Sequence, residues 1–187
     1  MPAEGISTEV KEYVFKITIL GQSAVGKTSL INQFVEGSFQ EDYKPTLGAN
    51  IIRKDVNIDD VNAKVRLIMW DLAGQEKYNV IRSMYFQGCV GSLLVYDVTR
   101  HESFAAIESK WLKDFKNYVK RESAYILIGN KTDLEEQRVV STEEGEKLAK
   151  KIGASIFIET SAKLGKNVET AFNNLVHQIL RNYGAKI

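Results

Sequence analysis

Cysteine is nearly absent from this sequence, because Cys89 is the only one in 187 residues. A single thiol excludes an internal disulfide and is typical of a reducing cytoplasm or of a small buried hydrophobe, so we expect Cys89 to be buried. An excess of one charge is also missing, since 25 lysines and arginines oppose 24 acids and the formal net charge is +1. Without a broad positive field, we expect no nucleic-acid partner.

Long apolar runs are missing as well. The first dozen residues carry Glu4, Glu9 and Glu12 instead of the apolar core of a signal peptide, and no later stretch approaches the ~20 apolar residues of a membrane span. Pro2 stands where N-myristoylation needs glycine, and residues 184–187 contain no cysteine for prenylation. We therefore predict a cytoplasmic protein without a membrane anchor in this chain, recruited to membranes through partners.

The length and the 44% hydrophobic content fit one well-buried domain and are too small for two. We expect this domain to span residues 13–182, between a flexible N-terminal segment of residues 1–12 and a short tail of residues 183–187. We also expect a monomer.

Short apolar runs predict the strands of the domain. These runs cover residues 13–20, 51–58, 65–70, 92–98, 125–128 and 155–158. The second and third runs are joined across Asp59-Asp60, which fits a hairpin, whereas a helix-length segment follows each of the others.

Helical periodicity separates these strands. Apolar residues recur on one face in residues 104–119 and 168–180, and Ser141 followed by Glu144 predicts a capped helix that ends at Gly153. We therefore predict an α/β fold with a six-stranded, mostly parallel sheet, one antiparallel edge strand and about five helices on both faces. Ligands of such sheets bind beyond the carboxyl ends of the strands.

The first strand leads into a phosphate-binding motif. GQSAVGKT, from Gly21 to Thr28, fits the pattern GxxxxGK[ST] after a strand and at the start of a helix, and a chance match should occur in well under ~1% of chains this long. In such a loop the backbone N–H groups surround the phosphates, the Lys27 ammonium reaches the β- and γ-oxygens, and the Thr28 hydroxyl ligates magnesium. We therefore predict a P-loop NTPase. The predicted nucleotide-binding residues of this segment are Gly21, Ser23, Ala24, Val25, Gly26, Lys27, Thr28 and Ser29.

A second motif, Asp71-Leu72-Ala73-Gly74, follows the third strand. Alone, a DxxG pattern occurs by chance in about half of such chains, but its position beside the phosphate loop gives it meaning. Asp71 is predicted to hold magnesium and Gly74 to offer its N–H to the γ-phosphate. Gln75 both donates and accepts hydrogen bonds, so we expect it to orient the attacking water.

A third motif, Asn130-Lys131-Thr132-Asp133, follows the fifth strand and decides which base is bound. Guanine presents N1–H and its exocyclic amine as adjacent donors, which the Asp133 carboxylate can accept together, whereas adenine has no such pair. Asn130 is expected to contact the acceptor edge of the base and to brace the loops, and the Lys131 stem to pack over the ring.

A fourth segment, Ser161-Ala162-Lys163, follows the sixth strand, where the Ala162 N–H can donate to the guanine carbonyl oxygen. Alone, this segment is a weak signal. Together, the four motifs resemble the Ras superfamily of small GTPases in their order and in the elements that bear them, over roughly residues 13–182.

Several segments are most similar to the Rab branch, namely DLAGQE at 71–76, LVYD at 94–97 and GNKTDL at 129–134. The phosphate loop, with Ala24 before Val25, is closer to the Rho style. Rab proteins commonly carry an aromatic residue at the place of Ile51 and most end in cysteines, which this chain lacks. The missing cysteines leave open a trimmed C-terminus or a lineage whose small GTPases are not prenylated.

The resemblance implies a switch that binds GTP or GDP with Mg²⁺, hydrolyses GTP and controls effector binding, in membrane trafficking or signalling. It places Phe39 against guanine, with Tyr43 and Thr46 in the first switch loop and residues 73–85 in the second. Thr46 closes over magnesium and the γ-phosphate. The implied magnesium ligands are Thr28, Thr46 and Asp71, and the implied catalytic residues are Lys27, Thr46 and Gln75.

Effectors, exchange factors and GTPase-activating proteins are the implied partners, with Tyr43, Trp70 and Tyr85 as candidate contacts. Trp70 fits a core role equally well. No motif position marks an arginine as an internal finger, so we expect slow hydrolysis that a partner's arginine accelerates by about 10³ to 10⁵.

Two other functions share part of this pattern. A P-loop kinase of a small metabolite would have the first motif, but it should lack Asn-Lys-x-Asp and carry an arginine-rich lid. A non-hydrolysing interaction module would stay loaded with nucleotide, and the intact Gln75 and Thr46 disfavour it.

His101 and His177 lack neighbours at metal-ligand spacing, and the lysines of 113–121 and 147–151 are expected to form solvated helix faces.

Overall fold

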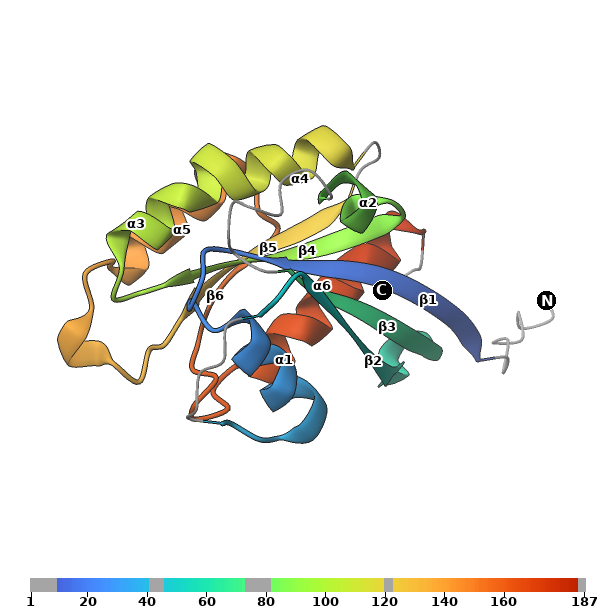
Figure 1. Cartoon of the computed structure of the whole chain (residues 1–187). Coiled ribbons are helices and arrows are strands. Elements are labelled where there is room, and N and C mark those ends of the chain that lie inside the picture. Colours follow the sequence, from blue (N-terminus) through green and yellow to red (C-terminus); the bar gives the residue numbers. More distant parts are fainter. Residues whose placement is uncertain (1–9, 41–45, 73–81, 120–122, 185–187) are drawn as a thin grey trace, which may run out of the picture.

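One twisted sheet forms the centre of the molecule (Figure 1). The computed structural model describes residues 10–40, 46–72, 82–119 and 123–184. In these residues the sheet has six strands in the order β2-β3-β1-β4-β5-β6, and only β2 runs antiparallel to its neighbour. The strands are β1 (Lys11–Leu20), β2 (Ala49–Ile58), β3 (Ala63–Leu72), β4 (Cys89–Asp97), β5 (Ala124–Asn130) and β6 (Phe157–Thr160). The predicted sheet, with its single antiparallel edge strand, is confirmed.

The strand ends differ from the predicted ones by a few residues. β1 begins at Lys11 because its ladder with β3 starts at the pair Lys11 and Ala63, before the apolar run begins. β6 starts two residues later than expected, since the Ser155 N–H bonds the Tyr125 carbonyl ahead of the ladder, which begins at Phe157. Apolar runs mark burial, whereas strand ends depend on the neighbouring strand.

All helices except the short α2 lie in the segments that the sequence predicts to be helical. The helices are α1 (Lys27–Glu36), α2 (Arg82–Phe86), α3 (His101–Ala106), α4 (Lys113–Tyr118), α5 (Thr142–Ile152) and α6 (Val168–Asn182). A π-helical stretch, Ile107–Leu112, joins α3 and α4 without a break, so residues 101–118 form one helical rod. The capping box of Ser141 and Glu144 and the left-handed Gly153 after α5 are both confirmed.

Two apolar layers hold the helices against the sheet. One contains α1 and α6, where the rings of Phe34 and Phe172 stack with centroids 4.0 Å apart. The other contains residues of α3 to α5 and includes Trp111 and Cys89, each 1% exposed. Burial raises the pKa of the Cys89 thiol, so it is a poor nucleophile. The expected buried cysteine is confirmed.

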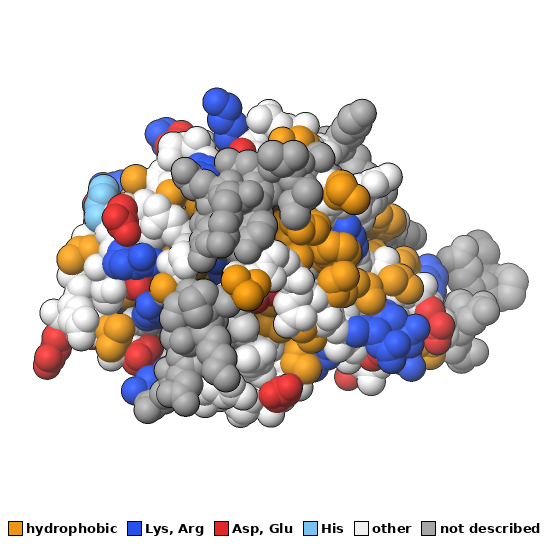
Figure 2. Space-filling view, viewed as in Figure 1, with side chains coloured by type: hydrophobic (Ala, Val, Ile, Leu, Met, Phe, Trp, Pro, Cys, Tyr) orange, Lys and Arg blue, Asp and Glu red, His pale blue; other side chains and the backbone are white. Residues whose placement is uncertain are grey.

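One face of the molecule keeps hydrophobic side chains in contact with solvent. In Figure 2 they gather over β1 to β3 and α2. Exposed hydrophobic residues of β1, β2 and α2 are Val14, Ile51 and Met84, at 66%, 55% and 68% exposure. The helices α3 and α5 pack against β4, β5 and β6 instead. Among the described residues, β1, β2 and α2 therefore keep exposed apolar side chains. In the described part of the chain, no helix combines the length and apolar content needed to cross a bilayer.

Candidate functional site

The loop between β1 and α1 surrounds a buried ammonium. Lys27 begins α1, is 6% exposed, and donates from Nζ to the carbonyls of Gly21 and Gln22, each at 2.9 Å. Gly21 packs so tightly that a Cβ there would lie 2.2 Å from the Val95 carbonyl oxygen, and Gly26 has φ +96°. A buried cation beside the open N–H groups of a helix N-terminus is suited to an anion such as phosphate.

The other predicted loop residues line the same turn. Ala24 is exposed and takes the left-handed φ of +63°, while Val25 is fully buried and anchors the loop. Ser23 is half-buried ahead of them, and Ser29 is half-buried in the first turn of α1. The buried Val25 side chain therefore anchors the loop in the apolar layer.

Three oxygen-bearing side chains converge next to this loop. The Thr28 hydroxyl donates to Oδ2 of Asp71 at 2.5 Å, and the Thr46 hydroxyl lies 3.0 Å from that of Thr28 and 3.4 Å from Asp71 Oδ2. Asp71 is fully buried, and its Oδ1 has no hydrogen-bond partner among the described residues. Burial raises the pKa of Asp71, although the bonds from Thr28 and Thr46 and the nearby Lys27 oppose the shift.

This cluster fits a magnesium ion by the chemistry of its donors. A buried carboxylate with one unpartnered oxygen and two hydroxyls provides the hard oxygen ligands that Mg²⁺ prefers. A cation there would offset the cost of keeping the Asp71 charge away from water. The sequence predicted this trio, and the fold brings it together from α1, β3 and the segment before β2.

Asn130 joins three loops at the end of β5. Its Nδ2 donates to the Val25 carbonyl at 2.9 Å, and its Oδ1 accepts from the Thr160 hydroxyl at 3.0 Å and from the Ala162 N–H at 3.2 Å. Asn130 is 1% exposed, so these bonds are shielded from water. The bracing expected for Asn130 is present in this geometry. The Ala162 N–H bonds Asn130 here, whereas the sequence suggested guanine as its acceptor.

Lys131 and Asp133 extend from the same loop with fixed side chains. Lys131 has the left-handed φ of +72° and pairs from Nζ with Asp97 Oδ2 at 2.7 Å. The Ser161 hydroxyl donates to Asp133 Oδ1 at 2.6 Å and accepts from the Leu164 N–H at 3.1 Å. These contacts orient the Asp133 carboxylate and the Lys131 side chain.

The remaining predicted residues are less constrained. Lys163 is exposed beyond Ala162, and Phe39 is 36% exposed after α1. Tyr43, Gly74 and Gln75 lie outside the described residues. Their predicted roles in the two switch loops and in hydrolysis stay predictions.

The sequence analysis did not identify three residues of this site. Asp97 ends β4 and is 1% exposed, Arg100 donates from Nη2 to the Ser23 carbonyl at 2.7 Å, and Thr160 bonds Asn130. Asp97 follows an apolar strand as Asp71 does, so the strand-end rule could have selected it. Arg100 and Thr160 have no signal of their own in the sequence.

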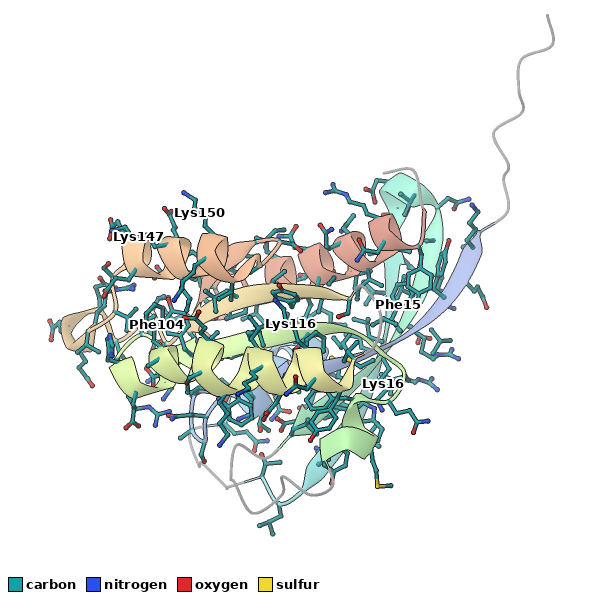
Figure 3. The ribbon with its side chains drawn as sticks, turned by 90° about the horizontal axis from the view of Figure 1, so that it is seen from above. Phe15, Lys16, Phe104, Lys116, Lys147 and Lys150 are labelled. Carbon is teal, nitrogen blue, oxygen red and sulfur yellow. The ribbon has the colours of Figure 1, made fainter. Side chains whose placement is uncertain are left out.

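The candidate partner surface brings aromatic rings together. Trp70 and Tyr85 have ring centroids 5.7 Å apart, and the Lys16 ammonium, labelled in Figure 3, lies 3.9 Å from the Trp70 ring centroid. Trp70 is half-buried and packs against the second apolar layer, which fits its core role, and its role as a partner contact stays a prediction. Ile51, opposite Trp70 on β2, adds an exposed aliphatic side chain.

The histidines and the α5 lysines, for which no ligand site was expected, have ordinary contacts. His177 bonds the Asn173 carbonyl at 2.8 Å and the Asp60 carboxylate at 3.2 Å, and the His101 ring lies against Phe104. Lys147 and Lys150 project from α5 away from the sheet in Figure 3, and both are exposed. This face of α5 is solvated, as predicted.

Comparison with known proteins gives a consistent picture. The Ras family matches residues 16–181 of this chain. The chain is 41% identical over 175 residues to "Ras-related protein RABA4b" of Arabidopsis thaliana, covering 94% of this chain and 76% of that protein. It is 42% identical over 170 residues to "Ras-related protein YPT3" of Nicotiana plumbaginifolia, covering 91% and 76%.

Proposed function

This chain belongs to the Ras family, as a Rab-like small GTPase that binds guanine nucleotide and hydrolyses GTP, and from that premise we propose which of its residues do the work. The observation that favours the assignment most is the convergence of Thr28, Thr46 and Asp71 beside the buried Lys27. A hydroxyl from a loop outside the sheet reaches a buried carboxylate there, which is the arrangement a γ-phosphate-sensitive switch needs.

The phosphates occupy the loop from Gly21 to Thr28. Lys27 provides a charge against the β- and γ-oxygens, and the left-handed turns at Ala24 and Gly26 direct backbone N–H groups toward them. Thr28, Thr46 and Asp71 would hold Mg²⁺. When bound, the ion supplies positive charge that stabilises the leaving oxygen.

The base lies between Lys131 and Phe39, with Asp133 accepting from its two adjacent donors. Ser161 holds the Asp133 carboxylate in place, and Asp97 holds the end of the Lys131 side chain. A site whose polar groups are already oriented rejects bases that leave those groups unpaired, by ~10⁴ in favourable cases.

Hydrolysis uses Gln75 to orient the water that attacks the γ-phosphate in line, while Lys27 stabilises the developing charge. Thr46 couples the presence of that phosphate to the first switch loop. Loss of the γ-phosphate removes the contact between this phosphate and Thr46, so the first switch loop relaxes. The partner surface around Trp70 and Tyr85 then changes. We propose that effectors and regulators read this change, in membrane trafficking or signalling. The monomeric state and the cytoplasmic location stay predictions.

Identification of the bound nucleotide tests the base assignment. Purified protein is denatured and the released nucleotide is identified by chromatography, with GDP or GTP as the expected result. Asp133→Asn keeps the shape of the side chain but replaces one carboxylate oxygen, an acceptor, with an NH₂ donor. Retention of GTP should therefore fall. Binding of xanthosine triphosphate, whose C2 carries an acceptor in place of the amine, should be gained. Adenine nucleotides in the wild-type protein would contradict the proposal.

A second test addresses the chemistry. Gln75→Leu should slow single-turnover phosphate release by about tenfold or more, because the water loses its orienting group. Gln137→Leu, at an exposed position on the Glu135–Gln137 turn, is the control and should leave the rate unchanged. An unchanged rate in Gln75→Leu would remove Gln75 from the mechanism while leaving nucleotide binding intact.

A further inference from the structure

A guanidinium joins the phosphate loop to the end of β4. Arg100 donates from Nη2 to the Ser23 carbonyl at 2.7 Å and from Nε to Asp97 Oδ2 at 3.3 Å. The planar fork of arginine has donors that point in different directions, so one side chain can bond both groups. Ser23 is in the loop that receives the phosphates, and Asp97 is the last residue of β4.

Asp97 in turn holds the loop that receives the base. Its Oδ2 also accepts from Lys131 Nζ at 2.7 Å, and its Oδ1 accepts from the N–H and the hydroxyl of Thr99 at 2.9 and 2.7 Å. The side chain is 1% exposed. Burial by itself raises the pKa of Asp97, but the bonds from Lys131 and Thr99 outweigh it and the pKa is lowered. The carboxylate therefore stays charged and fixes the position of the Lys131 ammonium.

We propose that Arg100 and Asp97 form a positioning link that makes the phosphate loop and the base loop move together and so slows nucleotide release. The inference rests on the proposed function, because it takes the two loops as the two halves of one guanine-nucleotide site. A bound nucleotide touches both loops, and either loop must move before it can leave. With the link intact, motion of the phosphate loop also disturbs Asp97 and Lys131.

The first test removes the arginine. Arg100→Ala should speed the release of a fluorescent GDP by about tenfold, the size expected for losing charge-assisted hydrogen bonds. Arg100→Lys keeps the charge but cannot span Ser23 and Asp97 together, so it should restore only part of the slow release. Arg181→Ala, an exposed arginine of α6, is the matched control and should leave release unchanged.

A second measurement separates a link from a local contact. Amide hydrogen exchange in Arg100→Ala should become faster in residues 22–25 and in residues 131–133, since the link joins both loops. In a double-mutant cycle with Asp97→Asn, the two changes should not multiply, and the double variant should release GDP within about twofold of the faster single variant. Where Asp97→Asn does not fold, hydrogen exchange of Arg100→Ala decides the question.

Release from Arg100→Ala within twofold of the wild type, faster exchange in the phosphate loop alone, or multiplying effects in the cycle would each overturn the link. These outcomes differ from failure of the proposed function. If the proposed function were wrong, the wild-type protein would not retain guanine nucleotide at all, and no release rate could be measured.

Discussion

Replacing Gly26 with alanine tests how the phosphate loop is built. Gly26 precedes α1 with φ +96°, and a Cβ there would lie 2.3 Å from Nδ2 of Asn130. The left-handed backbone costs about 1–2 kcal/mol for a residue with a Cβ. The clash also displaces the Asn130 amide from the Val25 carbonyl, a hydrogen bond that contributes about 1 kcal/mol. Together, about 2–3 kcal/mol predicts a rise of roughly 30- to 150-fold in the dissociation constant for GDP.

The measurement is GDP binding followed by fluorescence, paired with thermal unfolding of the nucleotide-free protein. Gly153→Ala is the matched control, because Gly153 has φ +74° at the end of α5 and its nearest atom, Tyr125 Oη, would be 3.5 Å away. It should lose stability without any change in GDP affinity. A change in GDP affinity below threefold in Gly26→Ala would refute the coupling between the loop backbone and Asn130.

Three further outcomes follow from the apolar layers and helix ends. Tyr96→Phe should stabilise the protein by about 1 kcal/mol in urea unfolding, because Tyr96 is fully buried and its hydroxyl has no hydrogen-bond partner among the described residues. A loss of stability would mean that the hydroxyl makes a hydrogen bond. Burial raises the pKa of Tyr96 above its ordinary value of 10.0, so wild-type stability should fall as pH rises past that value, and Tyr96→Phe should lose less when both are unfolded at high pH. Ser141→Ala should lower the free energy of unfolding by about 1 kcal/mol, because it removes the capping box of α5. The control Ser109→Ala, on an exposed helix face, should stay within about 0.5 kcal/mol of the wild type. Equal effects of the two changes in thermal unfolding would argue against the cap.

Much of the fold was predictable from the sequence because its signals are local. The apolar runs gave the number of strands, the hairpin at Asp59-Asp60 gave the antiparallel edge, and Ser141 with Glu144 gave the start of a helix. Strand ends were the weak point, as at Lys11 and Phe157, because the partner strand decides how far a ladder continues.

The candidate site divides in the same way. The glycines, lysine and threonine of the phosphate loop are adjacent in the chain, so spacing alone indicated their chemistry, and the strand-end rule found Asp71 and Asp133. Chain order could not reveal that Arg100 bonds Ser23, 77 residues away, or that Asn130 bonds Val25 across 105 residues. Such bonds depend on the twist and register of the sheet, which bring the ends of β1, β4 and β5 to one edge and set the distances between their side chains. The sequence by itself determined which chemical groups the site contains, and the tertiary structure decided which of them hold one another in place, because a hydrogen bond requires atoms about 3 Å apart and only the packed sheet fixes positions that closely.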